Sequence, residues 1–162
     1  QASKLDTTNE LLMYHISGTV ADYLCSDQQS TIEIIQMLQL EKLFNGFIFD
    51  QHLFSPLGYS INGIRGAEYF TIHITPQENS SYVSVETNID ISSAQVDIFA
   101  ELVRLLQPNS CDIIGFNSKI INKHFSNYLC LSHCAMTIEQ GFNIHFSHYQ
   151  QDCLEVLSPT LL

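Results

Sequence analysis

The sequence predicts an α+β fold in which helices cover one face of an antiparallel β-sheet. Residues 69–74 (YFTIHI) and 82–87 (YVSVET) are rich in aromatic and β-branched residues, and the short polar loop between them makes them a hairpin. Residues 93–106 (SAQVDIFAELVRLL) carry apolar residues at helical spacing and form the clearest predicted helix. Hairpin-linked strands interspersed with helices are typical of an antiparallel sheet with helices on one face.

The first half of the chain adds two strands and a helix to this layer. Residues 5–14 (LDTTNELLMY) and 47–54 (FIFDQHLF) are predicted as strands. Between them, residues 30–44 (STIEIIQMLQLEKLF) have apolar side chains at helical spacing, and Ser30 with Glu33 forms a capping-box pattern. Three glycines in the following segment predict a turn or tight connection between strands: Gly58, Gly63 and Gly66.

The last third is predicted to hold short strands near 111–116 and 142–148, with a weaker helical stretch around 119–129 between them. No internal repeat or linker divides the chain, so residues 1–162 are expected to form one domain. Such a layer leaves the second face of its sheet bare. The apolar composition favours packing of that face against another sheet.

Composition and charge limit the classes of partner. Hydrophobic residues make up 45% of the chain and charged residues 14%, which fits either an ordinary compact domain or one whose apolar surface is covered by something outside this sequence. The net charge of −11 and the lack of a basic cluster argue against nucleic acid and anionic membranes as partners. No apolar run reaches membrane-span length. A small cationic ligand or a basic partner is electrostatically easier.

The cysteines indicate a reducing compartment, and we expect a cytoplasmic protein. Five irregularly spaced cysteines do not make a disulfide framework. Cys130, His133 and Cys134 could suggest a metal site, but no second ligand pair lies at a suitable distance, so ordinary burial is the better interpretation and no metal is expected.

Two groups of polar residues stand out in the predicted strands. Asp6, Thr8 and Glu10 would project from one strand face, and Glu86 is a further carboxylate in an apolar run. Buried carboxylates must be solvated, protonated or paired with a cation, and a solvent-facing polar edge is the simpler alternative. His73 lies mid-strand, where a proton carrier could be held rigidly, although a core histidine is the commoner case.

The segments LFSPLGYSING, YFTIHITP and SYVSVETN, in this order and spacing, resemble blocks of eukaryotic-type S-adenosylmethionine decarboxylases. The resemblance extends upstream through LDTTNELLM and, more weakly, downstream to about residue 149. It implies that the chain is the C-terminal half of a duplicated αββα sandwich. It also implies a covalent pyruvoyl group, formed by self-cleavage at a serine in the N-terminal half, that acts as the electron sink for loss of CO2.

The resemblance also assigns roles to particular residues. His73 matches the base of self-processing, and Ser60 matches the serine that assists it. Phe54 matches the aromatic that stacks on the substrate adenine. An acidic cluster that binds the activator putrescine in the animal enzymes is matched by Asp6, Thr8, Glu10 and Glu86, with Phe116 and Phe142 near the aromatics that flank the diamine.

Two departures from the family pattern bear on activity. The glutamate that hydrogen-bonds the ribose hydroxyls is Gln77 here, which loses the charge-assisted bond. The Glu-Ser-Ser processing site is absent, so the pyruvoyl group must come from an N-terminal half or a companion chain. Three functions therefore stay open: part of an active decarboxylase that supplies polyamine synthesis, a non-catalytic regulatory paralogue that activates a partner, and a plain diamine-binding module.

Overall fold

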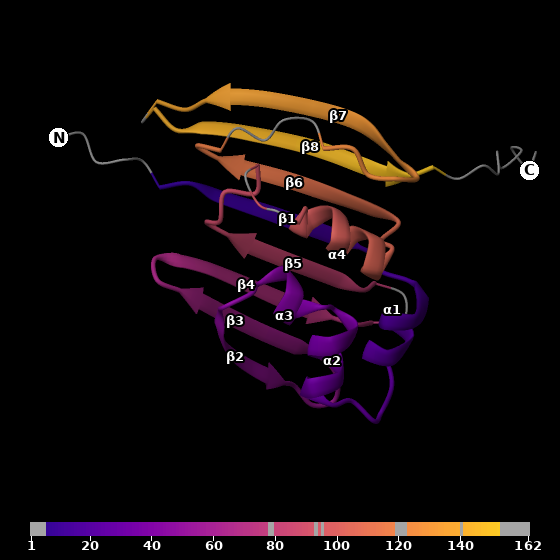
Figure 1. Cartoon of the computed structure of the whole chain (residues 1–162). Coiled ribbons are helices and arrows are strands. Elements are labelled where there is room, and N and C mark those ends of the chain that lie inside the picture. The colour runs from indigo at the N-terminus through magenta and orange to yellow at the C-terminus, as the bar shows by residue number, and fades with distance from the viewer. Residues whose placement is uncertain are drawn as a thin grey trace, which may run out of the picture.

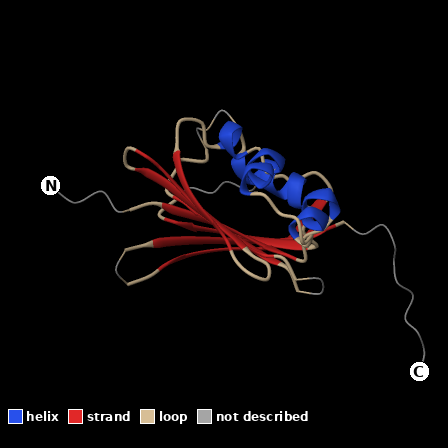
Figure 2. Cartoon of the chain, turned by 90° about the horizontal axis from the view of Figure 1, so that it is seen from below, coloured by secondary structure: helices blue, strands red, loops and turns tan. Residues whose placement is uncertain are grey.

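A single antiparallel sheet of eight strands, covered by helices on one face, makes up the computed structural model, which describes residues 6–77, 80–92, 94, 96–118, 123–139 and 141–152 (Figures 1 and 2). The strand order is β2-β3-β4-β5-β1-β6-β8-β7. The strands are β1 (Thr8–Tyr14), β2 (Ile48–Leu53), β3 (Tyr59–Arg65), β4 (Glu68–Thr75), β5 (Tyr82–Thr87), β6 (Ser110–Phe116), β7 (Tyr128–Thr137) and β8 (Asn143–Gln151). The helices are α1 (Gly18–Leu24), α2 (Thr31–Met37), α3 (Leu40–Leu43) and α4 (Ile98–Leu106).

Side chains alternate across the sheet between a buried helix face and a more open second face. In β1, Leu11 and Met13 are buried, whereas Glu10 and Leu12, at the alternate positions, are half-buried. The buried residues of β3 to β6 join those of the four helices in one core. We call the opposite side of the sheet the helix-free face; it carries the side chains that alternate with the buried ones, and Figure 2 shows no helix over it. The predicted α+β class and the one-sided helices are confirmed.

Residues 30–44 do not form the single capped helix that we predicted. The segment divides into α2 and α3 at Gln39, whose φ is 53°. Leu38 and Leu40 are both buried, and residues two apart point to different sides of a continuous helix, so the break lets both reach the core. Ser30 makes no side-chain cap, and Glu33 accepts a hydrogen bond from the Tyr23 hydroxyl instead.

The turn or tight connection predicted over Gly58, Gly63 and Gly66 is wrong for Gly63. Gly58 and Gly66, with φ of 141° and 61°, lie just outside the ends of β3, but Gly63 lies inside this strand. A Cβ at Gly63 would lie 2.1 Å from Cε1 of Phe70, whose ring stacks on that of Phe44 with centroids 3.6 Å apart. Glycine is required here because an aromatic ring occupies the place of its side chain.

The other elements follow the predictions closely, with one exception. The predicted strands correspond to β1, β2, β4, β5, β6 and β8, and the predicted helix at 93–106 is α4, which begins after Asp97; Ser93 and Gln95 lie outside the described residues. The Asp97 side chain accepts a hydrogen bond from Ala100 N at 3.1 Å. The helix expected at 119–129 is wrong over residues 123–129, because residues 123–127 are not helical and Tyr128 begins β7. Residues 119–122 lie outside the described residues.

No helix in the described part of the chain is both long and apolar enough to cross a membrane.

Replacing Gly63 by Ala should lower the free energy of unfolding by about 1–3 kcal/mol, because Phe70 is held by Phe44 and cannot yield space without loss of packing. Thermal unfolding followed by circular dichroism checks this, with a fall of several degrees in Tm expected. Asn62→Ala, at the exposed neighbouring position, is the control. Adding Phe70→Leu to Gly63→Ala should recover part of the loss. A Gly63→Ala Tm equal to that of the control would contradict this account.

Candidate functional site on the helix-free face

Ser60 and His73 lie directly opposite each other on neighbouring strands. The β3–β4 register pairs them, and both side chains project from the helix-free face. The row continues to His52 in β2, which pairs with Ser60, and to Ser84 in β5, which pairs with His73. Directly opposed residues have Cβ atoms about 5 Å apart, so the imidazole of His73 can reach the Ser60 hydroxyl. A hydroxyl beside an exposed imidazole can transfer a proton.

Two carboxylates face each other at the centre of the same face. The β1–β5 register places Glu10 opposite Glu86. Burial, and after it the negative charge of Glu86, raises the pKa of the Glu10 carboxyl above its usual range. Glu86 Oε1 accepts a hydrogen bond of 2.6 Å from the Tyr69 hydroxyl. Burial, followed by this bond, raises the pKa of Tyr69, so Tyr69 remains a neutral donor. The pair is therefore a region of unbalanced negative charge.

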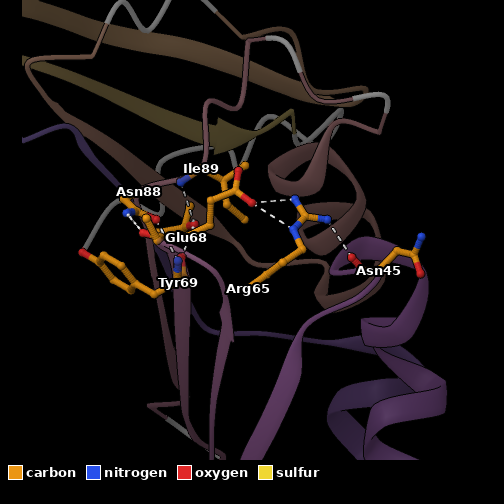
Figure 3. Close-up of polar contacts among 8 residues, drawn as sticks. Asn45, Arg65, Glu68, Tyr69, Asn88 and Ile89 are labelled. Atoms are coloured by element: carbon orange, nitrogen blue, oxygen red, sulfur yellow. Dashed lines mark hydrogen bonds and ion pairs between the residues drawn. The ribbon is translucent and has the colours of Figure 1, made fainter.

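Polar contacts at the start of β4 fix the backbone of Tyr69. Its N–H donates to Asn88 Oδ1 at 2.8 Å, and its carbonyl accepts from the Thr87 hydroxyl at 2.6 Å. In the preceding turn, Arg65 pairs with Glu68 at 2.8 Å and donates to the Asn45 carbonyl at 2.7 Å (Figure 3). These contacts fix the backbone from which the Tyr69 side chain reaches Glu86.

The other residues predicted for the acidic cluster are only partly brought together. Thr8 shares the helix-free face with Glu10, and its hydroxyl interacts with the Tyr69 hydroxyl. Phe116 of β6 pairs with Thr8 and lies on the same face. Asp6 precedes β1 and is exposed, so the strand alternation expected to align it does not extend to it. Phe142 lies half-buried in the turn before β8.

A third cluster on this face escaped the sequence analysis. The Tyr14 hydroxyl donates to Asp112 Oδ2 at 2.9 Å, and His148 Nδ1 lies 2.6 Å from Asp112 Oδ1. Burial, followed by the bond to Asp112, raises the pKa of Tyr14. These residues come from β1, β6 and β8, far apart in the chain. The one available signal was Asp112, a carboxylate within a predicted apolar strand.

Phe54 and Gln77 lie where β2 and β4 end, at the same end of the sheet. The Phe54 ring is 51% exposed and contacts the His52 ring edge-on, with centroids 4.5 Å apart. Gln77 lines a cavity of about 920 Å³ between the segment that follows β4, the loop after β2 and helix α1. Its Oε1 accepts a hydrogen bond of 2.7 Å from the Ser80 hydroxyl. A ligand at this end of the sheet could contact both residues.

The burial expected for Cys130, His133 and Cys134 is wrong, because all three lie exposed on the edge strand β7. His133 pairs with Ser147 and Cys134 pairs with Phe146, so these two side chains project from opposite faces of the sheet. Within the described ranges, no three His, Cys, Asp or Glu residues are grouped so as to hold a metal ion.

Comparison with known proteins gives a consistent result. The family model for adenosylmethionine decarboxylase matches residues 1–156. The S-adenosylmethionine decarboxylase proenzyme of Xenopus laevis is 34% identical over 142 residues, which are 86% of this chain and 40% of that protein. The proenzyme of Dictyostelium discoideum is 29% identical over 158 residues, which are 91% of this chain and 41% of that protein.

The fold is also similar to that of a solved structure. The crystal structure of the Trypanosoma brucei AdoMetDC-delta26 monomer superimposes with a TM-score of 0.78 at 24% identity, over 90% of this chain and 65% of that chain. At this identity the superposition establishes likeness of fold. The chain spans about two fifths of the length of the two curated relatives described above. With nearly its whole length matched by the family model, this chain belongs to the adenosylmethionine decarboxylase family.

Proposed function

We propose that this chain is part of a pyruvoyl-dependent S-adenosylmethionine decarboxylase, which supplies the decarboxylated product for spermidine and spermine synthesis. The observation that carries the proposal is the direct opposition of Ser60 and His73 on the helix-free face of a chain of this family. The relatives named S-adenosylmethionine decarboxylase proenzyme support it, because a proenzyme requires a processing step.

The pyruvoyl group would come from a serine outside this chain and, when present, would supply the electron sink for loss of CO2. The residues here fit a supporting role, because an imidazole and a hydroxyl face each other on an open surface that a neighbouring segment can approach. His73 would take up the α-proton during maturation, and Ser60 would orient or relay it. Ser84, opposite His73, can help to fix the orientation of the imidazole.

At the end of the sheet, Phe54 and Gln77 would bind the substrate. The exposed ring of Phe54 can stack on adenine, and its contact with His52 limits its rotation. Gln77 would face the ribose with an amide where the family pattern has a carboxylate. Because the Gln77 amide carries no charge, its bond to a hydroxyl is weaker than that of a carboxylate.

Glu10 and Glu86 would form the centre of a putrescine site. Burial, and after it the opposed charge of Glu86, raises the pKa of Glu10, and a dication between the strands would relieve the repulsion that a proton otherwise relieves. Thr8 and the fixed hydroxyl of Tyr69 add polar groups. Phe116, beside Thr8, gives an apolar wall for the methylene chain, and Phe142 is the second aromatic proposed there.

The partner would be the N-terminal half of the enzyme, or a companion chain, packed as a second sheet on the helix-free face. Exposed apolar side chains on this face, Ile48 and Ile64, support such a cover, since large apolar side chains are seldom left in water as part of a patch. This arrangement would make residues 1–162 one C-terminal repeat of an αββα sandwich, in a cytoplasmic enzyme.

A second candidate function is a regulatory paralogue that activates a partner decarboxylase, and Gln77 is the observation that favours it. Retention of Ser60 and His73 favours the active enzyme, because an inert paralogue needs no processing residues. Mass spectrometry of the protein purified from its source separates the two. A companion fragment with a processed terminus supports the active enzyme, and an unprocessed complex supports the regulatory role.

The isolated chain should show no decarboxylase activity, because the proposed pyruvoyl precursor lies outside it. Release of labelled CO2 from carboxyl-labelled S-adenosylmethionine, measured with the purified chain, checks this. The assembled protein serves as the positive control. Turnover by the isolated chain would show that it needs no second segment.

His73→Ala in the full-length precursor should stop self-processing at the ester stage, since the neighbouring Ser60 cannot replace the base. Gel electrophoresis should show uncleaved precursor that hydroxylamine then cleaves. His124→Ala, an exposed histidine away from the helix-free face, is the matched control and should process normally. Normal cleavage of the His73→Ala precursor would remove His73 from the mechanism.

Putrescine should raise the Tm of the assembled protein with increasing ligand concentration, and Glu86→Gln should abolish most of this rise. Glu86→Gln should also lower the pKa of Glu10 toward its ordinary value, because one repelling charge is gone. In the wild type, the rise should weaken as the pH falls into the raised range of Glu10, since a protonated Glu10 no longer attracts a cation. Thermal-shift titrations check this, with Glu41→Gln on α3 as the control. Equal shifts in both variants would indicate a merely solvated polar edge.

A further inference from the structure

The polar row that contains Ser60 and His73 reaches β5 at Ser84. This serine lies opposite His73 of β4 on one side and opposite Leu12 of β1 on the other. A leucine side chain offers no hydrogen-bonding group, so the row does not continue directly across β1. A polar neighbour comes instead from β5 itself. Tyr82 lies two residues before Ser84 on the same face, and its hydroxyl interacts with the Ser84 hydroxyl.

Tyr82 is held in place by neighbours on β1 and β6. Its ring contacts the Tyr14 ring, with centroids 5.6 Å apart and planes inclined by 41°. The Tyr14 hydroxyl donates to Asp112 Oδ2 at 2.9 Å, and His148 Nδ1 lies 2.6 Å from the other oxygen of the same carboxylate. These contacts, together with the half-burial of Tyr82, limit the positions that its ring can take.

The interaction between the two hydroxyls has a direction. Burial is the largest influence on the pKa of Tyr82 and raises it, whereas the Ser84 hydroxyl lowers it. A hydrogen bond lowers the pKa of a phenol when it is donated to the phenol oxygen, because it favours the charged form. Ser84 therefore donates its proton to Tyr82, and the lone pairs of the Ser84 oxygen are left to accept from another donor.

This direction matters because of what a base requires. A neutral imidazole has one N–H and one bare nitrogen, and the hydrogen bond made by one nitrogen sets the state of the other. If the Ser84 oxygen accepts the N–H of His73, the bare nitrogen lies on the side of Ser60. If Ser84 donated to His73 instead, the bare nitrogen would face Ser84, and the imidazole could not take up a proton on the Ser60 side.

We propose that Tyr82 is a positioning residue for self-processing. By accepting the proton of the Ser84 hydroxyl, it makes the Ser84 oxygen an acceptor for His73 and leaves the bare nitrogen of His73 facing Ser60. This inference deepens the proposed function and rests on it, because it assumes that His73 is the base of maturation. Tyr82 acts through Ser84 alone, and the cluster around Asp112 contributes by holding Tyr82.

The titratable groups near His73 on this face come from three strands in the described part of the chain. The residues of β3 on this face, Ser60, Asn62 and Ile64, do not titrate. The titratable groups are Asp50 and His52 on β2, Tyr69 on β4, and Tyr82 and Glu86 on β5. Tyr82 is the one member of this set that the variants below change, so a shift in the pH dependence of processing can be assigned to the Tyr82–Ser84 pair.

The test measures the rate of self-cleavage of the full-length precursor by gel electrophoresis over a range of pH. Tyr82→Phe and Ser84→Ala should each slow cleavage about 10-fold at the optimum, the effect of one lost hydrogen bond. Both should also move the acid limb of the rate profile to lower pH, because a bond accepted from His73 favours the protonated imidazole and that bond is lost or weakened. Ser84→Thr retains the hydroxyl and should keep most of the wild-type rate.

Further variants separate positioning from a general loss of structure. Tyr82→Phe combined with Ser84→Ala should be no slower than Ser84→Ala alone, because Tyr82 acts through Ser84. Tyr23→Phe removes a tyrosine hydroxyl from helix α1, on the other side of the sheet, and should cleave at the wild-type rate. A melting temperature for Tyr82→Phe equal to that of Tyr23→Phe shows that the fold is intact. If Tyr82→Phe does not fold, Tyr14→Phe, which releases the ring that holds Tyr82, should produce the same shift of the acid limb.

The outcomes distinguish this inference from the proposed function. If His73→Ala stalls while Tyr82→Phe and Ser84→Ala keep the wild-type rate and pH profile, the role of Tyr82 is overturned and the proposed function stands. A slower rate without a shift of the acid limb, or a double variant slower than Ser84→Ala, also overturns it, because a general structural defect would explain that result. A wild-type precursor that does not cleave itself overturns both proposals.

Discussion

The insertion of β1 between β5 and β6 is the constraint on which the rest of the structure depends. β1 joins a four-stranded group, β2-β3-β4-β5, to a three-stranded group, β6-β8-β7. Its register is set by Leu11 and Met13, which must face the helices to complete the core. Glu10 must then face the other way, directly opposite Glu86. The juxtaposition of two carboxylates is thus a consequence of burying their neighbours.

The two faces of the sheet separate the core from the proposed sites. The helix face closes on an apolar core drawn from all four helices. The helix-free face carries the Ser60–His73 row, the Glu10–Glu86 pair and the Asp112 cluster. Burial within this chain already raises the pKa of Glu10. A second sheet over this face would remove more water, so the need for a cation or a proton would grow.

The sequence was sufficient for what depends on local pattern. Six strands were identified from the sequence, the hairpin of β4 and β5 most clearly from its aromatic and β-branched residues, and α4 followed from its apolar stripe. The failures have physical causes. The break at Gln39 is imposed by two leucines that both reach the core. Gly63 was predicted to mark a turn, because the sequence does not show that the Phe70 ring occupies the space of a side chain at this position. β7 was missed because its residues are exposed on both faces and show no alternation.

Residues of the candidate site could be predicted from the sequence only where they lie in short local motifs. The family blocks supplied His73 and Ser60, and the strand register then explained why they meet. The cluster of Tyr14, Asp112 and His148 joins three strands, with Tyr14 and Asp112 alone 98 residues apart, and has no local signature.

The geometry of β4 relates the proposed sites to one another. Thr71 pairs with Glu86, His73 follows two residues later on the same face, and Gln77 lies beyond the end of the strand. At about 3.4 Å per residue, His73 stands roughly 7 Å along the strand from the acidic pair, and the end of the strand at Thr75 roughly 14 Å from it. Changes at the cleft and at the acidic pair should therefore be energetically independent, whereas His73 is near enough to respond to both. A charge placed between Glu10 and Glu86 would act electrostatically on the His73 imidazole, which lies on the same face of the sheet. A nucleoside at Gln77 would not require that charge in order to bind.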